Sequence, residues 1–231
     1  MKTKKVILFI VEGVTDKTSL GGIIDKLVSS NLVRFYITGG DITSDRFSNS
    51  SNVIAKVNDH VKIFIARELG IKKNDIIQIV HLIDMDGAYI PSDQIQVGEV
   101  EEFVYLESAI IAKSLEHVVE RNNRKQQAIN RLSLCPKISG IPYSMYYFSC
   151  NLEHVLHNKI NLADDLKMGY AERFSDSYYK DEATFVDFIR DEKFAVKGDY
   201  KETWEFIKLG GNSLKRYSNF HLFFDYKVID N

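Results

Sequence analysis

Three apolar segments of strand length alternate with two amphipathic segments of helix length, and this order constrains the fold more than any other feature of the chain. The apolar segments are residues 6–11, 32–38 and 76–83, and apolar side chains recur at helical spacing over residues 20–28 and 52–69. A strand that is covered by helices on both faces is apolar throughout. The sequence therefore predicts an α/β fold with a Rossmannoid parallel sheet flanked by helices.

The middle of the chain is less regular. Residues 91–103 are expected to form a loop, and residues 106–134 are expected to be mostly helical. The apolar run over residues 142–149 predicts a fourth strand, which leads into a helix within residues 150–157. If this strand is parallel to the others, the helix that follows it begins at the carboxyl edge of the sheet.

The last third of the chain is rich in aromatic residues. It is expected to be mostly helical and to end in a strand within residues 221–229. We place an α/β catalytic domain at residues 1–160 and a mostly helical extension, packed on the same core or beside it, at residues 161–231. A chain of 231 residues is long enough for a domain with an extension of this size.

The composition is that of an ordinary globular protein, with 45% hydrophobic residues, 27% charged residues and a net charge of -2. It lacks the basic excess of proteins that coat nucleic acid, although it allows a local basic patch. The apolar stretch after MKTKK is too short for a signal peptide and runs into Glu12, and no apolar run reaches the roughly 18 residues of a membrane span. Two cysteines make a disulfide framework unexpected. We therefore expect a cytoplasmic protein without membrane contact.

Carboxylates follow two of the expected strands. Glu12 and Asp16 come after the first strand, and Asp84 and Asp86 come after the third, where Gly87 allows a sharp turn. Any one of these acids would be ordinary, since loops are polar and Asp16, like the neighbouring threonine, can cap the next helix. Together they would meet at the edge where α/β sheets bind ligands, and four carboxylates repel one another unless a cation neutralises them. Oxygen ligands suit Mg²⁺ or Mn²⁺, which support displacement at phosphorus.

These motifs carry a family resemblance. A strand ending in "VEGVTD" and a later strand ending in "IDMDG" resemble the Toprim domain of topoisomerases, primases and OLD-type nucleases, over about residues 5–90. The resemblance implies that Glu12, Asp84 and Asp86 bind the divalent metal, and that Asp16 matches an acid found in nuclease members. It implies a metal-dependent nuclease that acts on DNA or RNA, tRNA included.

More loosely, the chain resembles small stand-alone Toprim-like proteins of phage defence, including the abortive-infection and RloB types. OLD nucleases carry an ATPase domain ahead of the Toprim domain, and nothing of that kind precedes the first strand here. The resemblance therefore implies a role in defence against phage, with any ATPase or regulatory partner either a separate chain or absent.

A further polar group is expected on the helix within "SCNLEHVLHNKI". Glu153, His154 and His157 fall on the side of a helical wheel opposite the apolar residues. Glu153 is a candidate catalytic residue that would supply a further metal ligand, and the two histidines are candidates for proton transfer or a substrate phosphate contact. The alternatives are a solvated helix face, or a zinc site that adds Cys135 and Cys150, whose spacing is unusual for structural zinc.

The segment "GGNSLKRYSNFH" is a second candidate for substrate binding. Lys215 and Arg216 could contact phosphate, and Tyr217 and Phe220 could stack on bases. The alternative is a loop before the last strand. For the chain as a whole, two other functions stay open beside a nuclease: a non-catalytic module that binds nucleotide or nucleic acid through a metal, and nucleotidyl transfer of the primase kind.

Overall fold

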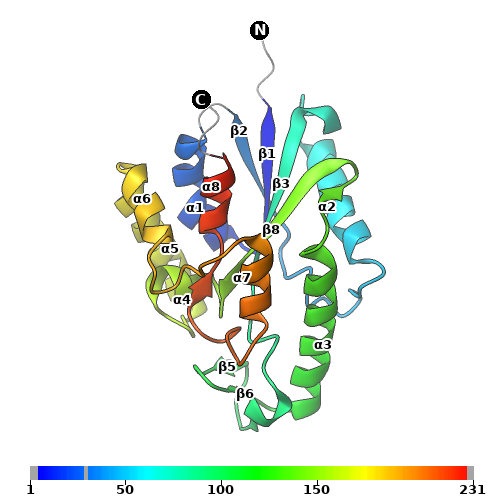
Figure 1. The fold of residues 1–231 in the computed structure, drawn as a ribbon, viewed down its shortest axis with the longest axis vertical. Coiled ribbons are helices and arrows are strands. Elements are labelled where there is room, and N and C mark those ends of the chain that lie inside the picture. Colours follow the sequence, from blue (N-terminus) through cyan, green and yellow to red (C-terminus); the bar gives the residue numbers. More distant parts are fainter. Residues whose placement is uncertain (1–4, 29–30, 228–231) are drawn as a thin grey trace.

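The computed structural model describes residues 5–28 and 31–227, and its centre is a parallel sheet (Figure 1). In sheet order, the four parallel strands are β2 (Leu32–Ile37), β1 (Val6–Val11), β3 (Ile76–Asp84) and β8 (Ile141–Ser149). Two short strands, β7 (Lys137–Ile138) and β9 (Tyr217–Ser218), pair antiparallel with the outer edge of β8. The predicted α/β fold with a parallel sheet is confirmed, and the four strands lie within one residue of the expected bounds.

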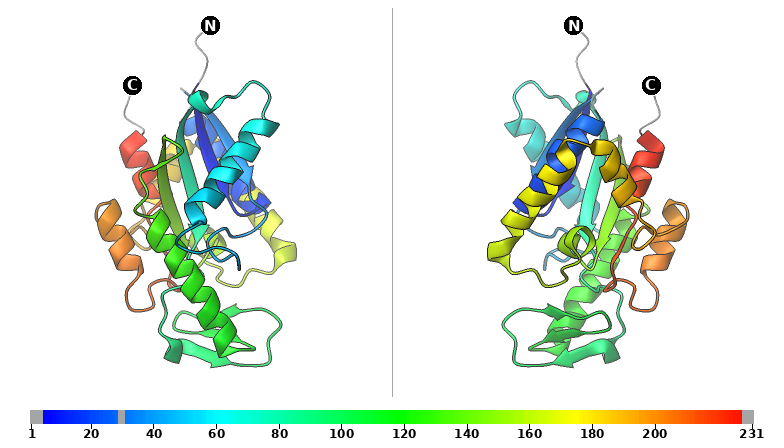
Figure 2. Two further views of the ribbon diagram at one scale, coloured as in Figure 1. Left: turned by 90° about the vertical axis from the view of Figure 1, so that its right-hand side faces the viewer. Right: turned by 90° about the vertical axis from the view of Figure 1, so that its left-hand side faces the viewer.

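Helices cover both faces of this sheet (Figure 2). One face packs against α2 (Val53–Arg67), α3 (Leu115–Leu132) and α7 (Tyr200–Ile207). The other packs against α1 (Val14–Leu27), α4 (Leu152–His157), α5 (Asp164–Tyr179), α6 (Glu182–Ile189) and α8 (His221–Lys227). Alternate residues of β1 point into the two cores, and every one of them is buried. This double burial is why the strand is apolar throughout.

Helix α1 begins earlier than its expected cap. Gly13 is the N-cap residue, and Asp16 is the third residue of the helix. The Asp16 carboxylate accepts the backbone N–H groups of Glu12 and Gly13 at 3.1 and 3.0 Å. Asp16 therefore caps the helix from within its first turn, where the helix dipole favours a negative charge.

A small sheet that the sequence analysis missed lies beyond the carboxyl ends of the large sheet (Figure 2). Its strands are β4 (Ile95–Val97), β6 (Ile110–Ala112) and β5 (Val104–Tyr105), in that order. The expected loop over residues 91–103 therefore contains a strand, together with a 3₁₀ turn (Ser92–Gln94). The expected helix over residues 106–134 begins only at Leu115, capped by Ser114. Strands of two or three residues are too short to show a period of two.

The expected strand within residues 221–229 was also wrong. Residues 221–227 form helix α8, and residues 228 and 229 lie outside the described part. Leu222, Phe223 and Phe224 are all buried, because α8 packs against the sheet among the rings of Phe9 and Tyr146. A fully buried turn of helix has the same continuous apolar pattern as a buried strand.

The helical segment after residue 160 shares both cores with the earlier part of the chain. Phe174 and Phe185 pack in the core that contains α1, and Trp204 and Ile207 pack in the core that contains α2.

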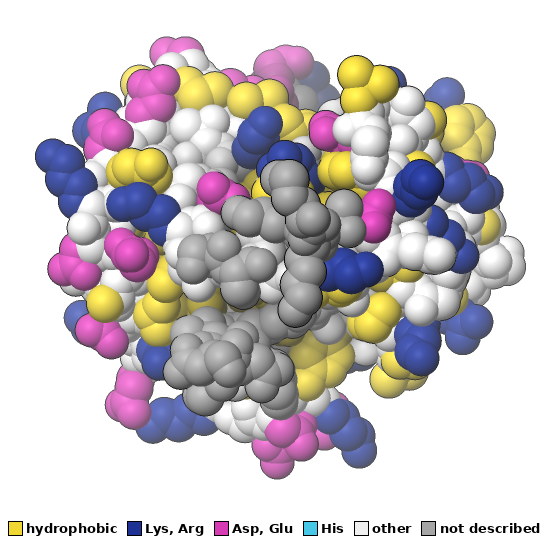
Figure 3. Space-filling model, turned by 90° about the horizontal axis from the view of Figure 1, so that it is seen from above, with side chains coloured by type: hydrophobic (Ala, Val, Ile, Leu, Met, Phe, Trp, Pro, Cys, Tyr) yellow, Lys and Arg dark blue, Asp and Glu magenta, His cyan; other side chains and the backbone are white. Residues whose placement is uncertain are grey.

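No helix of the described part is both long and apolar enough to cross a bilayer. At the amino ends of the strands, acidic and basic side chains are interspersed around the grey region (Figure 3). The described residues on this face therefore form no cluster of a single charge.

Candidate functional site

The carboxyl ends of β1 and β3 form the centre of the site. Strand β1 pairs with β2 on one side and β3 on the other, so the chain reverses its direction of progress across the sheet at this point. Such switch points open a crevice in which α/β sheets bind ligands. Glu12 follows β1, and Asp84 ends β3. Their two segments meet where the Asp84 N–H points at Glu12 Oε1, 3.4 Å away.

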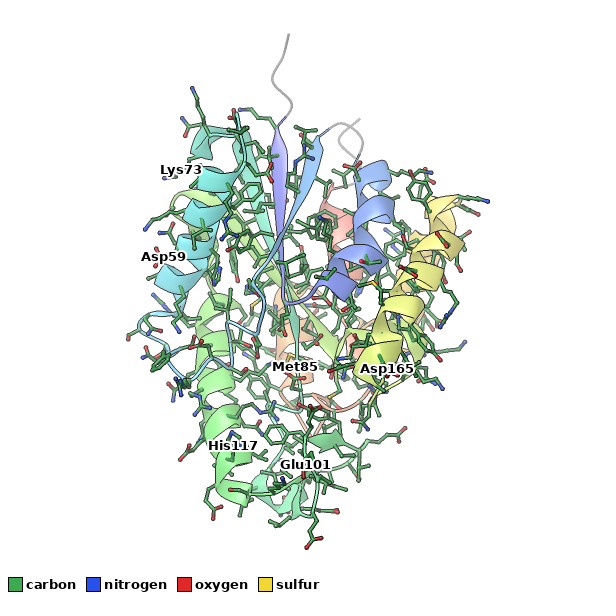
Figure 4. The ribbon with its side chains drawn as sticks, turned by 180° about the vertical axis from the view of Figure 1, so that it is seen from behind. Asp59, Lys73, Met85, Glu101, His117 and Asp165 are labelled. Atoms are coloured by element: carbon green, nitrogen blue, oxygen red, sulfur yellow. The ribbon has the colours of Figure 1, made fainter. Side chains whose placement is uncertain are left out.

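Figure 4 gives the surroundings of this crevice. Met85, which separates the two aspartates, lies at the carboxyl end of β3. Glu101, in the loop between β4 and β5 of the small sheet, lies beyond it, and Asp165, at the start of α5, lies to one side. The crevice is therefore bordered by the small sheet and by the amino end of α5.

Glu12 and Asp84 resist ionisation. Burial raises the pKa of Glu12 well above its usual value, and the negative charges of Asp41 and Asp86 raise it further, against the opposing effect of Lys125. Burial also raises the pKa of Asp84 well above its usual value, with Glu12 as the largest repelling neighbour. One Asp84 oxygen, Oδ1, accepts the backbone N–H of Leu152 at 2.9 Å. This pair therefore needs protons or a cation to be stable.

Asp16 and Glu153 extend the acidic cluster. Burial raises the pKa of Asp16 to about 6, and the Glu153 carboxylate adds to the rise. Glu153 is 7% exposed and also repels Asp84. The structure thus brings four of the candidate residues, Glu12, Asp16, Asp84 and Glu153, to one edge of the sheet. The alternative of a solvated helix face fails for Glu153, which is buried.

Asp86 is paired with a buried lysine. Lys125 Nζ, from α3, lies 2.5 Å from Asp86 Oδ2 and 2.7 Å from Asp41 Oδ2, and its side chain is 0% exposed. Arg121, one turn earlier, donates to the Asp86 backbone carbonyl at 2.9 Å. Burial alone would raise the pKa of Asp41, but the Lys125 ammonium holds that pKa at about 2. The same two carboxylates raise the pKa of Lys125 well above its usual value, although burial opposes them.

The sequence analysis missed Asp41, Arg121 and Lys125. Asp41 had a usable signal, since it follows the two glycines that close the second strand and so lies at the same sheet edge as Glu12. Arg121 and Lys125 gave no signal, because cations four residues apart on a helix are typical of a solvated face.

The cluster suits a divalent cation by its chemistry, although not by its present arrangement. Its donors are carboxylate oxygens, the ligands that Mg²⁺ and Mn²⁺ prefer. Among residues 5–28 and 31–227, however, no three Asp, Glu, His or Cys side chains are grouped so that they could hold one ion. Three of the acids already have partners: Asp16 and Asp84 accept backbone N–H groups, and Asp86 accepts from Lys125. The residues that would hold the cation are Glu12 and Asp84, aided by Asp16 and Glu153.

The two histidines of α4 contact groups other than the carboxylates. His154 Nδ1 accepts the backbone N–H of Cys150 at 3.2 Å, and burial together with the charge of Arg216 lowers the pKa of His154 to about 4. The ring of His157 packs against Tyr170 and Phe174, and burial lowers its pKa to about 4 as well. Both rings are therefore neutral at pH 7.

A zinc site built on both cysteines does not fit. The Pro136 carbonyl, next to Cys135, accepts the N–H of Tyr143 near the start of β8, whereas Cys150 follows its end. The seven residues from Tyr143 to Cys150 span roughly 23 Å of extended strand, far more than a shared ion allows.

Lys215 and Arg216 do not reach the carboxylates. They line a separate hollow with His154, which shares no residue with the groove beside Glu153. The preceding residues of the same segment are structural: the Ser213 carbonyl accepts the Gly87 N–H at 3.0 Å. Base stacking by Phe220 is excluded because this ring is 0% exposed.

The groove beside Glu153 is the larger opening at this edge. It has a volume of about 600 Å³ and runs between the small sheet and the start of α5. Tyr105 and Asn161 line it, together with Lys167, whose pKa is raised by Asp164 and Glu153 against the effect of burial. A substrate that enters here would reach the carboxylates past a lysine.

We compared the chain with known protein families, curated proteins and solved structures. No protein-family model, curated protein or solved structure matches the chain. We therefore infer function from the residues of the site.

Proposed function

We propose that this protein is a metal-dependent phosphodiesterase that cleaves nucleic acid. The observation that carries the proposal is the meeting of Glu12 and Asp84 at the switch point, both with a raised pKa, beside Asp16 and Glu153. A cluster of this kind is unfavourable by itself and becomes favourable when a cation replaces its protons. Bound Mg²⁺ or Mn²⁺ would polarise a phosphoryl oxygen and activate water.

The protein's own residues have distinct parts in this proposal. Glu12 and Asp84 bind the cation, and Asp16 and Glu153 complete the negative surroundings. Lys125 keeps the turn that carries Asp86 in place and supplies a fixed positive charge within the crevice. The groove beside Glu153 admits the substrate.

The test is cleavage of labelled tRNA, single-stranded DNA and double-stranded DNA, each with EDTA, Mg²⁺ or Mn²⁺. The wild type is compared with Asp84→Asn and with Asp59→Asn, a control whose side chain is 63% exposed. Cleavage that requires metal, is lost in Asp84→Asn and is kept in Asp59→Asn supports the proposal. Equal cleavage by the wild type and Asp84→Asn would refute it.

A non-catalytic binding module is the second candidate. It is favoured by Lys125, which already neutralises Asp41 and Asp86, so that part of the cluster is stable without added metal. Metal-dependent binding of an oligonucleotide without turnover in any of the reactions above would support this function instead.

A role in phage defence rests on the sequence resemblance alone. It predicts that phage form fewer plaques on bacteria expressing the wild-type protein than on bacteria expressing Asp84→Asn. Equal plaque numbers across a panel of phages would remove defence from the proposal and leave the enzymatic part standing.

A further inference from the structure

A basic hollow lies beside α4, separate from the groove at the acidic cluster. It has a volume of about 260 Å³ and is lined by Glu107, His154, Asn158, Lys193, Lys215 and Arg216. Three cationic side chains therefore face one carboxylate. Asp191 lies near the rim, where its carboxylate is 3.6 Å from Lys193 Nζ. The net charge of the lining is positive, in contrast to the neighbouring cluster.

Arg216 is fixed in this hollow. Its Nε and Nη2 donate to the Val155 carbonyl at 3.1 and 2.6 Å, and its guanidinium lies 4.8 Å from the centre of the Phe194 ring. Nη1 donates no hydrogen bond to any residue of the described part. A held guanidinium with a free edge loses little side-chain entropy when it binds an oxygen anion.

His154 adds a neutral donor. Its Nδ1 accepts the Cys150 N–H, so the ring proton of the neutral form is on Nε2. The side chain is 6% exposed and lines the hollow.

The two hollows are linked by adjacent residues. Glu153 lines the groove at the acidic cluster, and His154 lines the basic hollow. Consecutive Cα atoms are about 3.8 Å apart, so the two hollows meet neighbouring faces of the same turn of α4. The hairpin between β5 and β6 also borders both, through Tyr105 on one side and Glu107 on the other.

We propose that the basic hollow binds a phosphate group of a nucleic-acid strand whose neighbouring phosphodiester lies at the acidic cluster. The inference rests on the proposed function and specifies its substrate as a strand with several phosphates, not a mononucleotide. The acidic cluster repels a phosphate backbone, and cationic contacts with phosphates supply most of the affinity for nucleic acid. The basic hollow supplies that attraction next to the cluster, independently of any metal.

The test measures binding without metal, so that cleavage does not enter. A fluorescent single-stranded oligonucleotide of about twelve nucleotides, within the usual range of site sizes, is titrated in EDTA at several salt concentrations. The variant Lys193→Gln/Lys215→Gln removes two charges from the hollow. The matched control, Lys197→Gln/Lys201→Gln, removes two charges from side chains that are 78% and 79% exposed outside it.

We expect the first double variant to bind about tenfold or more weakly, and the slope of log K against log salt to become less negative by about 1.4, or 0.7 for each lost contact. The control should bind as the wild type does. Lys193→Arg/Lys215→Arg, which keeps both positive charges, should also keep the wild-type affinity. Equal binding by the two glutamine variants would overturn the proposal. Inorganic phosphate serves as a competitor: if it displaces the oligonucleotide at equal molar concentration, the hollow is a simple anion site and the strand assignment is wrong.

The outcomes of this binding test and of the cleavage test can be told apart. Loss of oligonucleotide affinity in the first double variant supports the hollow even when no cleavage is seen with Mg²⁺ or Mn²⁺. Metal-dependent cleavage with unchanged affinity in that variant leaves the proposed function standing and removes the phosphate site.

Discussion

Lys125 Nζ lies 2.5 Å from Asp86 Oδ2, and no part of the lysine side chain is exposed. A completely buried ammonium is stable only because carboxylates compensate its charge, and Asp41 supplies the second of these at 2.7 Å. The three side chains come from the ends of β2 and β3 and from the middle of α3. The pair therefore ties α3 to the edge of the sheet that carries the candidate site.

Replacing Lys125 by Met should destabilise the protein by about 3–5 kcal/mol, because Asp41 is left buried without a cation and Asp86 keeps only Arg121, 4.0 Å away. Urea unfolding in EDTA measures this loss. Lys62→Met is the control: Lys62 is 67% exposed, and its surface pair with Asp59 should contribute less than about 1 kcal/mol. A loss of under 1 kcal/mol for both variants would show that the buried pair does not stabilise the fold.

The acidic cluster should make stability depend on pH. The pKa of Asp16 is raised to about 6 in the folded state, so the unfolded protein loses the proton of Asp16 at lower pH than the folded one. The protonated Asp16 therefore stabilises the folded protein fully below its unfolded pKa of about 3.9. This contribution is lost as pH rises through about 6. The buried histidines His81, His154 and His157, with pKa values of about 4, act in the opposite direction over this range.

The variant Asp16→Asn separates these contributions. Its stability relative to the wild type should increase between pH 4 and pH 7, at about 1.4 kcal/mol for each unit of pKa shift. The measurement is the difference between the two urea-unfolding free energies at each pH, in EDTA, so that the histidine contributions cancel. A difference that stays constant with pH would mean that Asp16 ionises as it does in the unfolded chain.

Gly87 should tolerate no side chain. Its φ is +65°, and a Cβ atom there would lie 2.6 Å from Leu214 Cδ2 and 2.9 Å from Ile110 Cδ1. Gly87→Ala therefore combines backbone strain with overpacking, and we expect a loss of about 2–4 kcal/mol. Gly140→Ala has a similar φ of +82° but open space around it, so its loss should be about 1–2 kcal/mol. Equal losses in thermal unfolding would contradict the close packing at Gly87.

The sequence predicted the large sheet well because its central strands, β1 and β3, are buried on both faces. The apolar runs of β1, β3 and β8 record that burial directly. The meeting of Glu12 and Asp84 could be expected for the same reason, since parallel strands place their carboxyl ends at one edge. These predictions needed only local patterns and the direction of the strands.

Other features depend on contacts that no local pattern records. The small sheet uses strands of two and three residues, which are held by pairing with distant segments. Lys125 is in a helix whose other residues are mostly polar, so nothing in the sequence distinguishes it from an exposed lysine. The consecutive buried residues Leu222, Phe223 and Phe224 gave α8 a strand-like pattern. In each case tertiary packing decided the outcome.

Metal binding should be coupled to proton release. Burial and mutual repulsion raise the pKa values of Glu12 and Asp84, so a cation that binds both competes with protons for the carboxylates. Titration calorimetry with Mn²⁺ in two buffers of different ionisation heat measures the number of protons released. We expect release by the wild type and at least tenfold weaker binding by Glu12→Gln.

Glu68→Gln is the control for that experiment. Glu68 lies at the end of α2 with 43% of its side chain exposed, so the same change there should alter neither affinity nor proton release. Mn²⁺ binding that is equally strong in Glu12→Gln and Glu68→Gln would place the ion elsewhere. Tight binding by the wild type without proton release would mean that the carboxylates at the switch point are already ionised, which the burial of both side chains opposes.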